Sequence, residues 1–157
     1  MRLSSPAFEE GKLIPTRFTC EGEDMSPELS WEDAPGNVKS FALVLHDPDA
    51  PREGGFTHWV MYNIPQNVHR LEENIAKQAT VAGIGVQARN DGGKIGYVGP
   101  CPPSGIHRYF FRLIALDTML DLKPGAPHQE VLSALHGHRL GEAELMGTYQ
   151  KKADRAA

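Results

Sequence analysis

The sequence predicts a mainly β protein built from two packed antiparallel sheets. Three observations lead to this fold class. The chain has 157 residues, of which 12 are proline and 16 are glycine, and these interrupt it too often for a helical bundle. Its apolar segments have the length and the β-branched and aromatic content of strands. The segments between strand candidates supply too little helix for the βαβ units of a parallel sheet.

Four segments are the main strand candidates. Residues 41–47 form a continuous apolar run, which predicts a central strand buried on both faces. Residues 56–64 are β-branched and aromatic, and Pro65 ends them. Residues 108–117 are strongly apolar and predict a second central strand, and residues 141–150 fit a last strand. We expect these segments to form most of the sheet structure.

The other segments are shorter or less regular. Residues 3–8 are expected to form a short edge strand and residues 13–19 a second extended piece. The composition of residues 20–35 indicates a long loop. Residues 66–82 are expected to hold either a short, irregular helix or a loop. The glycine-rich residues 83–99 are expected to form a mobile loop.

One segment has the pattern of a helix. Residues 127–136 begin with a proline, and Gly137 follows them as a signal for the end of the helix. Within the long loop, Trp31 is expected to anchor the core. The tail after residue 150 is expected to fray.

Length and charge limit the classes of function. The chain fits a single domain over residues 1–157 and can bury roughly two-thirds of its unfolded surface. The net charge is −4 and there is no basic run, which argues against a nucleic-acid partner. No apolar run reaches the ~18 residues needed to span a bilayer, and the N-terminus lacks a signal-peptide pattern. These features predict a cytoplasmic protein.

The sequence has two cysteines, Cys20 and Cys101, which are far apart and not part of a CxxC motif. The favoured interpretation is two reduced, partly buried thiols. A disulfide would require their Cα atoms to lie within about 7 Å, a distance that the sequence does not provide.

A rigid turn precedes the strand candidate at 108–117. Residues 99–105 read Gly-Pro-Cys-Pro-Pro-Ser-Gly, and each proline fixes its φ angle and removes a backbone donor. The two glycines are expected to supply positive φ angles. His107 and Tyr109 follow two residues apart, so an extended chain places both on one face. This arrangement resembles the rim of a binding site.

Five polar residues occupy the ends of strand candidates next to proline turns, where binding groups are often found. Each has a structural explanation when it is taken alone, such as a turn aspartate or a hydrogen-bonded core histidine. Together they could donate several hydrogen bonds to an anion, while a carboxylate fixes an imidazole tautomer. The five are Asp47, Asp49, His58, His107 and Tyr109.

An enzyme is the alternative to a binding protein, but the sequence lacks the common catalytic motifs. No HxH, HExxH or Cys/His spacing includes these residues, and the best match to such a motif, His136-Gly137-His138, lies at a predicted helix end. No GxSxG nucleophile motif and no phosphate-binding glycine loop occurs. The sequence therefore favours a binding protein over an enzyme, without a cofactor or metal. The alternative is a small hydrolase or metal-dependent enzyme that uses the same histidines and aspartates.

Three blocks of the sequence carry a family resemblance. They are Asp-Pro-Asp-Ala-Pro at 47–51, Thr-His-Trp at 57–59, and the turn and strand start at 99–109. In this order and spacing they closely resemble the signature blocks of the phosphatidylethanolamine-binding proteins, in the bacterial and archaeal branch that is similar to Raf kinase inhibitors. Supporting similarity covers most of the chain.

The resemblance implies a fold, a site and a class of function. The fold would be two antiparallel sheets with a Greek-key element and one or two short helices. The pocket would accept phosphate, phosphoryl headgroups such as that of phosphatidylethanolamine, or other small anions. Family members are described as modulators of kinases or proteases, and a homodimer is a further expectation. Four residues would line the pocket and four would shape it: Asp47, His58, His107 and Tyr109, with Asp49, Pro51, Gly99 and Pro100.

Overall fold

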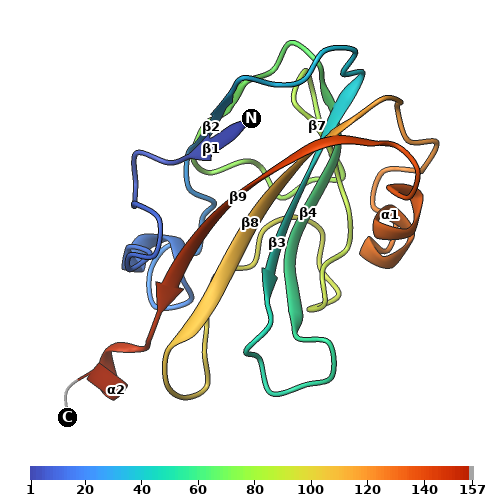
Figure 1. Cartoon of the computed structure of the whole chain (residues 1–157). Coiled ribbons are helices and arrows are strands. Elements are labelled where there is room, and N and C mark those ends of the chain that lie inside the picture. The colour runs from blue at the N-terminus through green and yellow to red at the C-terminus, as the bar shows by residue number, and fades with distance from the viewer. Residues whose placement is uncertain (156–157) are drawn as a thin grey trace.

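The computed structural model describes residues 1–155, which form two antiparallel sheets (Figure 1). The large sheet has six strands in the order β6-β7-β4-β3-β8-β9, and the small sheet has the order β1-β2-β5. The large sheet contains β3 (Ser40–Asp47), β4 (Phe56–Pro65), β6 (Thr80–Val81), β7 (Gly85–Gln87), β8 (His107–Leu116) and β9 (Arg139–Tyr149). The small sheet contains β1 (Arg2–Ser4), β2 (Leu29–Glu32) and β5 (Arg70–Leu71).

The connections of the large sheet form a Greek key. The strands β3, β4 and β7 are neighbours in that order, and β8 then returns to lie beside β3 on its other side. A fourth strand that lies beside the first defines this motif. Both the predicted fold class and its Greek-key element are therefore confirmed.

The main core lies between the two sheets. Trp31 of β2 packs edge-on against Phe41 of β3, with 5.5 Å between the ring centroids, and is 4% exposed. The prediction that Trp31 anchors the core is confirmed. Trp59 of β4 and Phe111 of β8 belong to the same cluster of buried side chains. Trp59 and Phe111 lie on the face of the large sheet that is turned toward the small one.

Helix α1 (His128–Ala134) covers part of the opposite face of the large sheet (Figure 1). Val131 of this helix belongs to a second buried cluster with Val60 and Tyr62 of β4. Strand β3 is consequently buried on both faces over nearly its whole length, as its continuous apolar run predicted. The predicted helix over 127–136 is also confirmed, and Gly137 after it has a φ of +79°.

Two predictions for the N-terminal third were wrong. Residues 13–19 are not simply extended, because Thr16–Phe18 form a short 3₁₀ helix, η1. The segment 20–35 is not only a loop, because it contains β2. The edge strand expected at residues 3–8 is present but shorter, as β1 at the edge of the small sheet.

The middle of the chain differs from its prediction in the same way. Of the two alternatives for residues 66–82, the helix is wrong, and the segment is mostly loop with the two-residue strands β5 and β6 in it. Residues 83–99 contain β7, and Gln87 at its end is fully buried. At the other end of the chain, Lys152–Arg155 form one turn of helix, α2. None of the helices among residues 1–155 is long and apolar enough to cross a bilayer.

The two cysteines form a disulfide, which corrects the expectation of two reduced thiols. The Cα atoms of Cys20 and Cys101 are 5.4 Å apart, within the range for a bridge. The bridge joins the loop after η1 to the proline-rich turn before β8. Sequence spacing did not reveal it, because 81 positions separate the two residues and only the tertiary fold brings them together.

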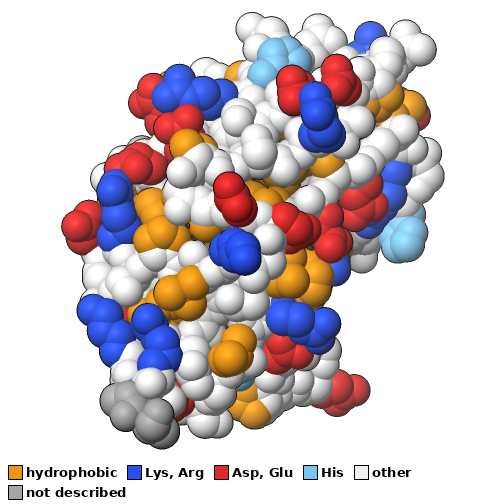
Figure 2. All heavy atoms as spheres, turned by 60° about the vertical axis from the view of Figure 1, so that its left-hand side comes forward, with side chains coloured by type: hydrophobic (Ala, Val, Ile, Leu, Met, Phe, Trp, Pro, Cys, Tyr) orange, Lys and Arg blue, Asp and Glu red, His pale blue; other side chains and the backbone are white. Residues whose placement is uncertain are grey.

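Charged side chains of both signs are mixed on the surface. Figure 2 shows Lys and Arg interspersed with Asp and Glu on the face it presents, with hydrophobic side chains scattered among them. The described part of this face therefore has no extended patch of one sign. The large exposed hydrophobic residues, such as Leu13 and Ile106, are single residues on different segments.

Candidate functional site

The candidate site lies where three strands of the large sheet meet at one end. Strand β3 ends at Asp47, β4 begins with Phe56 and β8 begins with His107, and antiparallel pairing brings these positions together. The turns at this end are at the bottom of Figure 1. They enclose a cavity of about 260 Å³, which we call the strand-end pocket.

An irregularity in β4 directs His58 toward this pocket. Leu45 of β3 pairs with Trp59, but the next residue, His46, pairs with Thr57, so His58 has no partner in the ladder. Such a β-bulge places two successive residues opposite one and redirects a side chain. His58 lines the strand-end pocket, whereas Thr57 lines a different cavity on the other face of the sheet.

The His58 ring is fixed by one hydrogen bond. Its Nδ1 lies 2.7 Å from the carbonyl oxygen of Val98, and since a carbonyl only accepts, Nδ1 carries the hydrogen. The side chain is 6% exposed, and this burial lowers the pKa of His58 below its usual value. In the neutral ring, Nε2 is therefore an acceptor that a ligand can use.

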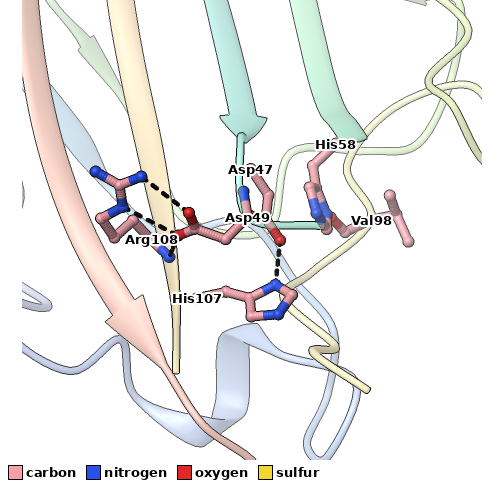
Figure 3. Close-up of polar contacts among 6 residues, drawn as sticks. All are labelled: Asp47, Asp49, His58, Val98, His107 and Arg108. Carbon is pink, nitrogen blue, oxygen red and sulfur yellow. Dashed lines mark hydrogen bonds and ion pairs between the residues drawn. The ribbon is translucent and has the colours of Figure 1, made fainter. Parts of the chain in front are cut away.

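His107 is held by a carboxylate. Its Nδ1 lies 2.7 Å from Oδ2 of Asp47, and both residues are buried (Figure 3). The other carboxylate oxygen, Oδ1, accepts the backbone N–H of Asp49 at 2.7 Å. Asp47 therefore fixes the tautomer and the orientation of the imidazole, as the sequence predicted. As in His58, Nε2 is the nitrogen left for a ligand.

The Tyr109 ring contacts both imidazoles. It stacks with His107 at 6.4 Å between centroids and meets His58 edge-on at 5.4 Å. Burial and the nearby Asp47 raise the pKa of Tyr109, so the phenol keeps its proton. Among the described residues, its hydroxyl has no hydrogen-bond partner, although it is fully buried. A buried hydroxyl without a partner loses about 1–3 kcal/mol of solvation, which a ligand could restore.

The structure brings six of the eight predicted site residues to the wall of this pocket. These six are Asp47, Pro51, His58, Gly99, His107 and Tyr109. Asp49 and Pro100 do not line it. Pro100 instead accepts the backbone N–H of Cys20 through its carbonyl oxygen at 3.1 Å, which places it behind the wall.

Asp49 faces the outside of the site. Its carboxylate accepts three N–H groups of Arg108, the backbone at 2.8 Å, Nε at 3.0 Å and Nη2 at 2.9 Å (Figure 3). These hydrogen bonds lower the pKa of Asp49 to about 2. The residue thus fastens the turn after β3 to the start of β8, so it supports the pocket without lining it.

Gly99 has a different role from the one predicted. Its φ angle is not positive, unlike that of Gly105, which is +71°. A side chain at Gly99 would place its Cβ 2.4 Å from both Oδ1 of Asp24 and the carbonyl oxygen of Phe18. The position needs glycine because the backbone there packs directly against the loop after η1.

Sequence reasoning missed part of the pocket wall. Pro102 and Pro103 lie in the turn that had been singled out, and Arg52 directly follows Pro51. Phe56 and Val98 complete the apolar part of the wall. Proximity to the predicted residues was the available signal for Arg52 and the prolines, whereas Val98 gave no signal of its own.

The pocket thus combines a polar base with a mostly apolar wall. It offers two imidazole nitrogens and one hydroxyl group to a ligand, and Arg52 adds a cation at the wall. No group of three His, Cys, Asp or Glu side chains within residues 1–155 is arranged to hold a metal ion. The geometry suits a small polar group that both donates and accepts hydrogen bonds.

Comparison with known proteins identifies relatives over nearly the whole chain. The family model described as phosphatidylethanolamine-binding protein matches residues 4–150. A UPF0098 protein of Methanothermobacter thermautotrophicus is 54% identical over 96% of this chain and 99% of the relative. A UPF0098 protein of Aquifex aeolicus is 46% identical over 96% of this chain and 89% of the relative.

Solved structures give the same result. The phosphatidylethanolamine-binding protein homologue CT736 of Chlamydia trachomatis has a TM-score of 0.87 and 42% identity, covering 96% of this chain and 97% of that one. YbcL of E. coli, described as a new member of the mammalian PEBP family, has a TM-score of 0.89 and 32% identity, covering 96% and 98%. The chain therefore belongs to the phosphatidylethanolamine-binding protein family.

Proposed function

We propose that the chain is a non-catalytic binding protein whose strand-end pocket takes a phosphate or phosphoryl headgroup. The observation that carries this proposal is the unpartnered hydroxyl of Tyr109, whose ring contacts two imidazoles with Nδ1 atoms that are already bonded. A phosphoryl oxygen can accept from the hydroxyl. In the neutral ring of His58, Nε2 needs a donor, which a P–OH group or an ethanolamine ammonium supplies.

The wall of the pocket supports binding rather than catalysis. None of the described residues that line it is Ser or Thr, and Cys101 is in the disulfide. A hydroxyl or thiol nucleophile of the usual kind is therefore missing beside the imidazoles. The alternative, a small hydrolase on the same residues, predicts release of p-nitrophenol from p-nitrophenyl phosphate. We expect the wild-type protein to release no more p-nitrophenol than the His107→Gln variant.

The hydrogen-bond pattern implies that binding takes up protons. As pH rises, the phosphate group loses its P–OH near pH 6, and the burial that lowers the pKa of His58 favours its neutral form, in which Nε2 accepts. Affinity for glycerol 3-phosphate, a phosphate monoester without an ammonium group, should therefore fall from pH 5.5 to pH 8, by up to about tenfold per pH unit for each proton bound. Calorimetry in two buffers with different ionisation enthalpies measures the uptake. Equal affinity at both pH values would contradict this model.

Tyr109→Phe is the sharpest variant for the proposal. It removes one hydroxyl that has no partner within the described chain, so the free energy of unfolding should stay constant or rise. Affinity for inorganic phosphate and O-phosphoethanolamine should fall about tenfold, as expected for one lost hydrogen bond of about 1.5 kcal/mol. His136→Gln is the control, because His136 is exposed and outside the pocket. If the Tyr109→Phe variant binds as tightly as the control, the proposed site is wrong.

Other parts of the proposal concern partners and location. A kinase or protease modulated through this pocket would be released by excess O-phosphoethanolamine, which competes for the same groups. Glycerophosphoethanolamine, which has no P–OH group, separates lipid-type headgroups from phosphate monoesters.

The homodimer and the cytoplasmic location stay predictions. The disulfide argues against the cytoplasmic location, because reducing compartments keep most thiols unpaired.

A further inference from the structure

A second and larger cavity, of about 540 Å³, lies on the opposite face of the large sheet. Side chains alternate along β8, so Arg112 and Ile114 face this cavity while His107 and Tyr109 face the strand-end pocket. We call it the sheet-face cavity. Helix α1 and the turn at 52–55 contribute to its wall. Its size is within the range of small-molecule sites.

Three guanidinium groups line the sheet-face cavity, those of Arg52, Arg112 and Arg139. Arg112 donates Nε to Glu144 at 3.0 Å, and Arg139 donates Nη1 to Glu142 at 3.1 Å. A guanidinium has five N–H donors. Each of these two ion pairs uses one of them, so most of the donors are left for a ligand.

Arg112 is held in position before any ligand arrives. Its Cζ lies 4.9 Å from the centroid of the Phe110 ring, in addition to the ion pair with Glu144. A side chain that is already ordered loses less entropy on binding. The charge of Arg112 also reaches into the cavity, because burial and then Arg112 lower the pKa of His46, which lines the same cavity.

Three carboxylates also line the cavity, those of Glu53, Asp91 and Glu142, and Glu142 is paired with Arg139. Oδ2 of Asp91 accepts the backbone N–H of Thr57 at 2.7 Å, and Oδ1 lies 3.4 Å from Nε2 of His128 and 3.7 Å from Arg52. Its carboxylate is thus satisfied by the protein. A ligand anion would meet the free donors of Arg112 rather than this carboxylate.

The sheet supplies an apolar surface beside the arginine. Val44 of β3 pairs directly with Arg112 of β8, and Ile114 follows two residues later on the same face. Leu132 of α1 lines the cavity from the helix and is half-buried. A ligand with an apolar body could therefore contact these side chains while its charged group reaches the guanidinium.

We propose that the sheet-face cavity binds a small organic acid, that is, an apolar body that carries one carboxylate. The carboxylate would be held by Arg112, with Arg52 and Arg139 adding positive charge, and the body would lie against Val44 and Ile114. A planar guanidinium matches a carboxylate in charge and in geometry. This site shares no lining residue with the strand-end pocket except Arg52 and does not depend on its proposed function.

The test uses 3-phenylpropionate as the probe and the full chain labelled with ¹⁵N. We expect saturable chemical-shift changes at the backbone amides of Val44, Arg112 and Leu132. The neutral analogue 3-phenylpropan-1-ol should bind at least tenfold more weakly. Changes confined to residues of the strand-end pocket, or equal affinity for acid and alcohol, would overturn the proposal.

Two variants make the test specific. Arg112→Gln should weaken 3-phenylpropionate at least tenfold while leaving the alcohol unchanged. Leu132→Glu should weaken both compounds, and the acid more, because it removes an apolar contact and adds a charge that repels the carboxylate. Arg70→Gln is the matched control, because Arg70 also pairs with a glutamate, Glu28, but lies on β5. If both cavity variants bind the acid as the control does, the proposal is wrong. His107→Gln should leave this binding intact, which separates the result from the headgroup function.

Discussion

Breaking the Cys20–Cys101 disulfide should strongly destabilise the fold. The bridge closes a loop across 81 positions. In the loop-entropy relation, closing a loop of this size lowers the entropy of the unfolded chain and so raises its free energy by about 4.5 kcal/mol at 25 °C. We therefore expect the Cys20→Ser/Cys101→Ser variant to lose about 4 kcal/mol of unfolding free energy.

Unfolding in guanidinium chloride measures this loss. With a slope of about 4 kcal/mol/M, the midpoint should fall by about 1 M. The two single variants should match the double variant, because each of them removes the same bridge. The oxidised wild type and the wild type in excess dithiothreitol provide the reference and a chemical route to the same broken bridge.

The same variant should change ligand binding less than stability. The pocket wall remains fastened by other bonds, since Gly99 donates its N–H to Asp24 at 2.6 Å and Tyr97 donates its hydroxyl to Phe18 at 2.7 Å. Phosphate affinity should thus fall only slightly. A midpoint that stays within about 0.2 M of the oxidised protein would refute the loop-entropy reasoning.

Three further predictions concern single residues. Gln87→Leu should lower the unfolding free energy by about 3 kcal/mol or more, measured by urea unfolding, because the buried amide accepts from Trp59 at 2.7 Å and donates to two carbonyl groups; a loss below about 1 kcal/mol would contradict it. Gly99→Ala should lower the melting temperature through a loss of about 1–3 kcal/mol, whereas Gly36→Ala, with open space around it, should not. The lowered pKa of Asp49 stabilises the fold above pH ~4, and this contribution is lost as pH falls through about 2. Between pH 5 and pH 2, Asp49→Asn should therefore lose less unfolding free energy than the wild type, as measured by unfolding titrations at each pH.

The parts of the fold that the sequence predicted have long, continuous signals. Strands β3 and β4 bury a run of side chains, β8 buries most of its side chains and β9 buries alternate ones, and such burial leaves a readable pattern. Strands β5 and β6 have only two residues each. So few residues show no periodicity, and their pairing depends on partners that the local sequence does not indicate.

The site was predictable to the extent that its residues belong to recognisable blocks. Asp47, His58 and His107 lie in the segments that carried the family resemblance, and the structure gathers them. Asp49 lies in the same block but faces Arg108, because the turn after β3 sends neighbouring carboxylates in different directions. Arg52 was missed because it precedes the strand and belongs to no block.

The bulge at His58 makes the spacing along β4 as important as the residue types. Deleting one residue between Phe56 and Trp59 would remove this bulge from the ladder, so β4 would present one side chain fewer to the pocket. A relative that keeps the histidine but has a different spacing to this tryptophan would not present it to the same pocket. Comparisons within the family should therefore match the interval between these residues as well as their identities.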